Sequence, residues 1–320
     1  MKTSSVIRRH KNNPVLSVRD VPYNDALVFN AGVTKFKGRY VMIFRNDFGS
    51  LKDKTLTDKT CLGIAFSDDG IKWNVEKERL IKDTDSLLYR AYDPRLTVLD
   101  DKLYMCFALG DKCGTRGGVA VTEDLKNWEV LSLSTPDNRN MVIFPERING
   151  KIYRLERPFA SYLRPGDRFD IFISASHDGV YWGETELLLS ASEVPWANEK
   201  IGPAAPPIKT AKGWLTLFHG VDVDASRKWG WSGTWNKRYS AGIMLLDLND
   251  PRKIKGICRE PVLVPEPECA YEAEGYRDYV VFPGGMILEN DGMVKIYYGA
   301  ADTVECLAET HVDDLIALCR

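Results

Sequence analysis

Short apolar and aromatic runs, separated by Gly, Asp and Asn, recur along the chain, whereas patterns with a helical period are scarce. Such spacing predicts β-strands joined by tight turns. The stretch LLYRAYDPRLTVLDDKLYMCFAL, residues 87–109, is typical, because its two apolar runs are expected to form short strands on either side of a turn at 100–101. The first strand begins with YDPR (92–95), in which the proline favours extended backbone at Asp93.

A unit that ends in tryptophan recurs three times. It reads AFSDDGIKW at 65–73, AVTEDLKNW at 120–128 and SASHDGVYW at 174–182, and its tryptophans are 55 and 54 residues apart. This interval is close to the length of one β-propeller blade. We expect these tryptophans to pack between neighbouring blades and to take no part in chemistry.

A second unit, a strand followed by a polar turn and an aromatic-rich strand, occurs five times. Its copies span 30–45, 93–109, 140–157, 204–220 and 282–300. Five hairpins of one kind predict an all-β fold, a five-bladed β-propeller, with a single domain covering residues 1–320. A sandwich of two sheets is the alternative fold that this pattern leaves open.

The composition narrows the class of protein. A formal net charge of −2 and a pI near 6.2 argue against a general nucleic-acid-binding surface. The basic N-terminal stretch lacks the apolar core of a signal peptide, and no apolar run approaches the length that spans a membrane. The seven cysteines include no CxxC pair, which favours free thiols in a reducing compartment; they are Cys61, Cys106, Cys113, Cys258, Cys269, Cys306 and Cys319. We therefore expect a cytoplasmic protein.

The predicted propeller brings one set of residues together. The innermost strand of each blade runs along the central channel, so the equivalent ends of the five first strands meet at one mouth. Those positions hold Asn30, Asp93, Arg139 with Asn140, the segment 200–206, and Phe282. Asp93 is then one member of a ring that forms a site, and not an isolated turn residue.

Signatures of several other chemistries are missing from the sequence. No GxSxG, Walker loop, GxGxxG or HExxH occurs, and the four histidines are too scattered to predict a metal site. Basic residues are instead frequent near the predicted blade mouths. Each alone is typical of a solvated or ion-paired surface, but as a group they predict a pocket for an oxyanion; the group is Arg45, Arg139, Arg157, Lys200 and His219.

One acid beside several cations favours a particular way of cleaving a glycosidic bond. An inverting hydrolase needs a second carboxylate as the base that deprotonates water. Inorganic phosphate is already an anionic nucleophile and needs only to be positioned. The predicted ring, with Asp93 as its acid, therefore favours phosphorolysis over hydrolysis, with phosphate as co-substrate and no metal or organic cofactor.

Several motifs, in order along nearly the whole chain, resemble those of glycoside hydrolase family 130, the five-bladed mannoside phosphorylases. They are NNPVL, FNAGV, YDPR, FPERINGKIYRLERP, AAPPI, LFHG, VFPGG and YYGAADT. The resemblance is nearest to the branch that acts on β-mannosides and β-1,4-mannooligosaccharides. It implies an inverting phosphorylase that converts a β-mannoside and phosphate, reversibly, to α-mannose 1-phosphate and a shortened acceptor. A β-mannosidase hydrolase and a non-catalytic carbohydrate-binding propeller stay open as alternatives.

The resemblance also implies roles for individual residues. Asp93 would be the general acid, passing its proton through a hydroxyl of the bound mannose. The residues implied to bind the mannoside are Asn30, Arg45, Tyr92, Tyr239 and Asp302, and those implied to bind phosphate are Arg139, Asn140, Arg157, Lys200 and His219. Family members that hydrolyse lose the basic set, and this sequence keeps it.

Two long loops, 47–60 and 221–238, are expected to shape the acceptor side of the site. The second carries Trp229, Trp231 and Trp235, which would either stack on an acceptor sugar or pack against a neighbouring subunit. The sequence leaves the linkage preference, the acceptor and a homo-oligomeric state open.

Overall fold

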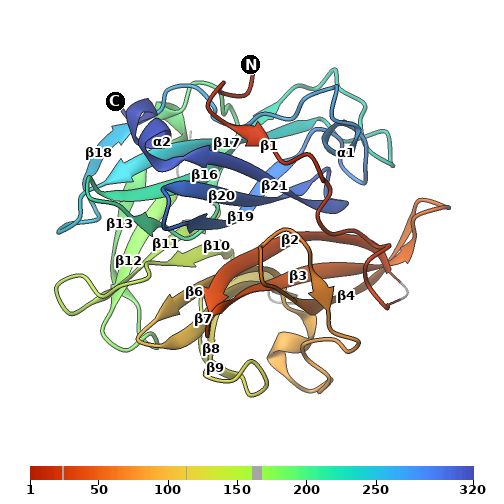
Figure 1. Cartoon of the computed structure of the whole chain (residues 1–320), viewed down its shortest axis with the longest axis horizontal. Helices are drawn as coiled ribbons and strands as arrows, with labels where there is room; N and C mark the ends of the chain where they lie inside the picture. The colour runs from red at the N-terminus through yellow and green to blue at the C-terminus, as the bar shows by residue number, and fades with distance from the viewer. Residues whose placement is uncertain (24, 113, 161–167) are drawn as a thin grey trace.

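The computed structural model describes residues 1–23, 25–112, 114–160 and 168–320, and these form five antiparallel sheets around a common axis (Figure 1). The first sheet contains β2 (Asp25–Phe36), β3 (Arg39–Ser50), β4 (Thr55–Ser67) and β5 (Asn74–Val75). The second contains β6 (Tyr92–Leu99), β7 (Lys102–Asp111), β8 (Gly114–Thr122) and β9 (Glu129–Leu133). The third contains β10 (Asn138–Ile143), β11 (Ile152–Pro158), β12 (Ile171–Ser176) and β13 (Gly183–Leu189).

The last two sheets depart from this simple order. The fourth contains β14 (Lys200–Pro203), β16 (Trp214–Val223), β17 (Lys237–Leu246) and β18 (Ile254–Ile257), and β15 (Ile208–Lys209) also pairs with β16. The fifth contains β19 (Val281–Leu288), β20 (Met293–Ala300), β21 (Val304–His311) and the N-terminal β1 (Arg8–Arg9). The helices are short: η1 (Leu87–Arg90), η2 (Ala191–Glu193), α1 (Ala270–Ala273) and α2 (Val312–Leu318). The predicted five-bladed β-propeller is confirmed, and the two-sheet alternative is wrong.

The five predicted hairpins correspond to the inner strands of the five blades. Neighbouring blades cover both faces of these strands, so they read as nearly continuous apolar runs; β16 is buried from Trp214 to Val221. Outer strands are more exposed, as in β13. The stretch 87–109 differs from expectation at its start, because residues 87–90 form the 3₁₀ helix η1 and the strand begins at Tyr92.

The recurring tryptophans pack between blades, as predicted. Trp73 of the first blade meets Tyr297 of the fifth edge to face, with ring centroids 5.9 Å apart. Trp182 of the third blade packs against a cluster that includes Tyr104 and Val119 of the second, and the Arg154 guanidinium lies 4.1 Å from its ring centroid. These rings therefore stabilise blade-to-blade contacts, away from the central mouth.

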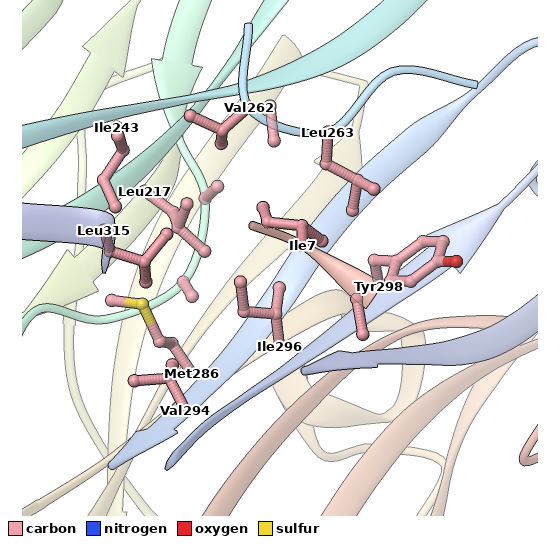
Figure 2. Close-up of a cluster of buried hydrophobic side chains, with 14 of the residues drawn as sticks. Ile7, Leu217, Ile243, Val262, Leu263, Met286, Val294, Ile296, Tyr298 and Leu315 are labelled. Atoms are coloured by element: carbon pink, nitrogen blue, oxygen red, sulfur yellow. The ribbon is translucent and has the colours of Figure 1, made fainter. Parts of the chain in front are cut away.

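The two ends of the chain close the propeller together. β1 pairs with β21, so an N-terminal strand completes the blade whose other strands are C-terminal (Figure 1). Figure 2 shows the apolar cluster under this junction, in which Ile7 and Leu315 of α2 pack with residues of the fourth and fifth blades such as Leu217 and Ile296. Burial of this shared core ties both termini to the fold.

Two further findings concern expectations from composition. Across the described ranges, no helix is long and apolar enough to cross a membrane. Cys106, Cys258, Cys269, Cys306 and Cys319 carry free thiols, and Cys113 lies outside the described residues.

Candidate active site

A cavity of about 250 Å³ lies at one end of the propeller axis, where residues from all five blades or the segments leading into them converge. Polar side chains dominate its lining. The lining residues are Asn30, Arg45, Tyr92, Asp93, Arg139, Asn140, Arg157, His219, Tyr239, Arg277, Val280, Phe282 and Asp302. The first strands therefore do meet at one mouth, as the repeat predicts.

A β-bulge in each of the first three inner strands turns a polar side chain into this cavity. The strand registers shift between Phe29 and Gly32, between Tyr92 and Arg95, and between Arg139 and Val142. The residues inside the bulges have left-handed backbone, with φ of +50° at Asn30, +50° at Asp93 and +57° at Asn140. Bulges commonly re-aim side chains beside active sites.

The extended backbone expected at Asp93 is therefore wrong. The bulge demands a left-handed residue, and this requirement outweighs the preference imposed by Pro94. Asp and Asn tolerate this region better than most residues. Each such position still costs on the order of 1–3 kcal/mol, so the surrounding structure must hold it.

The Asp93 carboxylate is held in its ionised form. It accepts hydrogen bonds from Asn30 Nδ2 at 3.0 Å and from Arg45 Nη1 at 3.3 Å. Burial by itself would raise the pKa of Asp93, but Arg45 and Arg95 outweigh that effect and lower the pKa below its usual value. Asp93 is then a carboxylate at neutral pH in the protein alone.

Arg45 is fixed by contacts on several sides. Its Nε and Nη2 donate to the two carboxylate oxygens of Asp47 at 2.8 and 2.7 Å, and its guanidinium lies between the rings of Phe29 and Tyr92. Burial opposes its charge, yet Asp93 and Asp47 raise the pKa of Arg45 above its ordinary value. This bidentate pair fixes the Arg45 guanidinium, so its remaining donor, Nη1, has little freedom to move.

A second carboxyl in the cavity has the opposite pKa shift. Asp302 has left-handed backbone with φ of +49°, and its Oδ2 lies 3.3 Å from Arg277 Nη1. Burial raises the pKa of Asp302, in spite of Arg277 and Arg45, and the charge of Asp93 adds to the rise. Two carboxyls whose pKa values are pushed apart are typical of sites that move protons.

Basic groups gather on the third and fourth blades, and among the described residues only Lys200 of this group has a carboxylate partner, Glu199. Arg139 and Arg157 are cross-strand partners, and Arg157 Nη1 lies 3.2 Å from His219 Nε2. Burial, then Arg157 and Lys200, lower the pKa of His219, so its neutral ring accepts from Arg157 through Nε2 and carries its proton on Nδ1. We call Arg139, Arg157, Lys200 and His219 the basic cluster.

Several donors of the basic cluster have no hydrogen-bond partner within the described part of the chain. They are Arg139 Nε, Arg157 Nε and His219 Nδ1, all buried. Burial and the charge of Arg139 lower the pKa of Arg157 to about 9, which leaves it charged at neutral pH. Buried N–H donors that lack an acceptor destabilise the folded protein, and a bound anion would accept from them.

Lys200 belongs to the basic cluster but does not line the cavity itself. Its Nζ lies 3.4 Å from Glu199 Oε2, 5.5 Å from the Tyr239 ring and 5.7 Å from the Phe169 ring. Burial lowers the pKa of Lys200 to about 7, with Glu199 opposing and Arg157 adding to the shift. Its charge is therefore sensitive to any anion that binds nearby.

Comparison with known proteins identifies the family. A family model described as beta-1,4-mannooligosaccharide phosphorylase matches residues 2–320. The chain belongs to glycoside hydrolase family 130. A Ruminococcus albus protein named beta-1,4-mannooligosaccharide phosphorylase is 34% identical over 97% of this chain and 90% of its own length.

Other family 130 relatives carry different linkages in their names. A 1,2-beta-oligomannan phosphorylase from Thermoanaerobacter sp. is 31% identical over 97% of this chain and 98% of its own length. The structure of a beta-1,2-mannobiose phosphorylase from Listeria innocua, solved with beta-1,2-mannobiose, has a TM-score of 0.82 at 26% identity, over 98% of this chain and 99% of that chain. The family predicted from the motifs is confirmed.

The structure brings together every residue that the sequence proposed for the site. Ten line the cavity, and Lys200 stands beside Tyr239 at its edge. The sequence missed Asp47, which orients Arg45, and Arg277, which pairs with Asp302. Arg277 had a usable signal, because it is a basic residue shortly before the fifth inner strand, much as Arg139 begins the third.

The tryptophan-rich loop packs on its own chain. Trp229 lies against Tyr279 at 4.4 Å between ring centroids, Trp231 meets Tyr276 edge to face, and Trp235 stacks on Tyr239 at 5.9 Å. Residues 47–60 are mostly an extension of the β3–β4 hairpin and not a loop. Among the described side chains, no group of three or more His, Cys, Asp or Glu is placed to hold a metal ion.

Proposed function

We propose that this family 130 enzyme is an inverting β-mannoside phosphorylase, which uses inorganic phosphate to cleave β-mannosides to α-mannose 1-phosphate and a shortened acceptor. The observation that carries the proposal is the basic cluster beside Asp93, with its buried, unpaired donors. The names of the relatives support it, since the Ruminococcus albus protein and the two relatives with β-1,2 linkages in their names are all called phosphorylases.

The mannosyl unit would occupy the part of the cavity formed by the first and fifth blades. Arg45, fixed by Asp47, supplies a placed donor there, and Asp302 supplies an acceptor for sugar hydroxyls. Asn30 and Asp93 face the same space, with Tyr92 and Tyr239 as aromatic walls. Hydrogen bonds already hold these side chains before the sugar binds, so binding costs little side-chain conformational entropy.

Phosphate would bind to the basic cluster and to Asn140, where its oxygens accept from the unpaired donors of Arg139, Arg157 and His219. Arginine suits this role because its planar fork matches oxyanion geometry. Positioning alone supplies much of the rate enhancement for an anionic nucleophile. A hydrolase, by contrast, would need a second carboxylate to activate water, and the second carboxyl of this cavity, Asp302, is instead paired with Arg277.

Phosphate binding would also prepare Asp93 as an acid. Burial raises the pKa of Asp93, and the charges that bring it down include Arg45 first and Arg139 among the others. An anion bound at Arg139 offsets that contribution and adds a negative charge, so the pKa of Asp93 rises toward that of an acid. Phosphate binding thereby favours the acid form of Asp93.

The proton inventory of the reaction is balanced. A phosphate oxygen forms a bond to C1 of the mannosyl unit as the C1–O bond to the acceptor breaks. The Asp93 proton passes through a mannose hydroxyl to the departing acceptor oxygen, and the proton of HPO₄²⁻ restores Asp93. The chemistry requires neither a metal nor an organic cofactor.

We further propose β-1,4-linked mannooligosaccharides as substrates, on the strength of the family description and the Ruminococcus albus relative. A cytoplasmic location is favoured by the free thiols of Cys106, Cys258, Cys269, Cys306 and Cys319. The test of the proposed function is the rate of β-1,4-mannobiose cleavage with and without phosphate. Cleavage that needs phosphate supports a phosphorylase, equal rates would identify a hydrolase, and no turnover would indicate a binding protein.

A further inference from the structure

Arg277 is the charged group of the cavity that neither the mannosyl site nor the phosphate site uses fully. One of its five N–H donors approaches Asp302 at 3.3 Å, and its backbone N–H donates to the Ala301 carbonyl at 3.1 Å. The Arg277 side chain is 42% exposed, whereas that of Asp302 is 11% exposed. No other acceptor among the described residues pairs with the guanidinium, so it presents free donors at the mouth of the cavity.

The aromatic loop holds this guanidinium in place. The Trp235 ring centroid is 4.7 Å from the Arg277 guanidinium, and Trp235 stacks on Tyr239 with an angle of 18° between the rings. Trp235 Nε1 donates to the Asp278 carbonyl at 3.0 Å, and the Asp278 carboxylate accepts from the backbone N–H of Gly230 at 2.8 Å. Loop and arginine thus form one ordered wall.

The exposure of Arg277 places it on a route by which a leaving group reaches solvent. In an inverting displacement the nucleophile and the leaving group lie on opposite faces of the sugar ring. The basic cluster belongs to the third and fourth blades, and the charge nearest Arg277 is instead Asp302, at the end of the fifth. Arg277 lines the cavity beside Asp302 and is the more exposed of the two, so a sugar that leaves the mannosyl site toward solvent passes Arg277.

We propose that Arg277, backed by Trp235, binds the acceptor sugar and sets acceptor preference; this rests on the phosphorylase function proposed above. The acceptor is a hexopyranose with neighbouring hydroxyls. The planar guanidinium donates to two of these oxygens at once, which a lysine cannot reproduce. The Trp235 ring packs on Tyr239 and on the guanidinium, so its part is to position Arg277.

The test uses the synthetic direction, with α-mannose 1-phosphate as donor and β-1,4-mannobiose as acceptor. Arg277→Ala is expected to raise the acceptor KM by about ten- to a hundredfold while the KM for α-mannose 1-phosphate changes little. Arg277→Lys is expected to leave most of this loss in place. Arg39→Ala is the matched control, because Arg39 also lies over an aromatic ring, that of Phe66, but outside the cavity.

Two results would overturn the proposal. One is a rise in the KM for α-mannose 1-phosphate in Arg277→Ala that is absent in Arg277→Lys. Arg277 would then serve only to neutralise Asp302 for mannosyl binding. The other is an unchanged acceptor KM in Arg277→Ala. If Arg277→Ala does not fold, Trp235→Leu tests the same wall and is expected to raise the acceptor KM selectively. Failure of the phosphorylase function itself would show in the wild type, as cleavage that ignores phosphate.

Discussion

Asp93 shows how much a single residue depends on its neighbours. Its identity as the candidate acid follows from the sequence, because the hairpin repeat places it at the mouth of the second blade. Its left-handed backbone does not follow, because the bulge is a property of the β6–β7 ladder and not of the tetrapeptide. Local propensity is overridden there by strand pairing.

Replacing Asp93 with Asn tests its role as the acid. The amide has nearly the same size and tolerates φ of +50° equally well, so the fold should persist. It cannot donate a carboxyl proton, and kcat on unactivated β-1,4-mannobiose should fall by about 10²–10⁴-fold. Initial rates measure the loss, and thermal unfolding checks the fold. Near-normal turnover would exclude Asp93 as the acid.

Lys200 offers a prediction on pH dependence. Its pKa is about 7 in the protein alone, so at pH 8 it is mostly neutral, and a phosphate anion nearby raises its pKa again. Phosphate binding at pH 8 should therefore take up a proton at Lys200, and Lys200→Met should take up about one proton fewer. Calorimetry in buffers of different ionisation enthalpy measures this difference. Equal uptake by both proteins would contradict the assignment.

At the scale of elements, the bulged inner strands depend on close packing from the fifth blade. A Cβ at Gly299 of β20 would lie 2.1 Å from Asn30 Oδ1 and 2.8 Å from the Asn30 backbone nitrogen. Gly299 is thus what lets the β2 bulge present Asn30 to Asp93. The sequence predicts both strands, but this contact between blades has no local signal.

Gly299→Ala is expected to displace Asn30 and to weaken its 3.0 Å hydrogen bond to Asp93. A misplacement of about 1 Å in an active site can reduce the rate by roughly 10²-fold, and kcat should fall on that order. Gly110→Ala in β7 is the matched control, because an added Cβ there meets no atom within 4 Å. Similar kcat values for the two variants would show that Asn30 tolerates displacement.

At the scale of the whole molecule, closure of the ring depends on an ion pair that the sequence did not reveal. Arg9 of β1 donates from Nε and Nη2 to the two carboxylate oxygens of Glu272, each at 2.8 Å, and the Glu272 side chain is fully buried. A two-residue strand has no periodicity, and its partners lie at the far end of the chain. Such a contact cannot be read from spacing.

Arg9→Met should lower the free energy of unfolding by about 3–5 kcal/mol, because the buried Glu272 carboxylate loses its counter-ion, although it keeps hydrogen bonds from the Tyr298 hydroxyl and the Glu266 backbone N–H. Adding Glu272→Gln should recover part of the loss, since the neutral amide is less costly to bury. Urea denaturation of both variants and the wild type measures these differences. A loss below about 1 kcal/mol, the range of a surface ion pair, would show that the pair does not secure closure.

The central claim, that the basic cluster delivers phosphate to the mannosyl carbon, is tested most directly by the product. NMR of β-1,4-mannobiose incubated with the enzyme and phosphate identifies both the compound released and its anomeric configuration. We predict that α-mannose 1-phosphate forms first, in amounts equal to free mannose, and that Arg157→Ala slows its formation. Two mannose molecules per mannobiose with no phosphate ester, or the β-anomer of the ester, would contradict the proposed reaction.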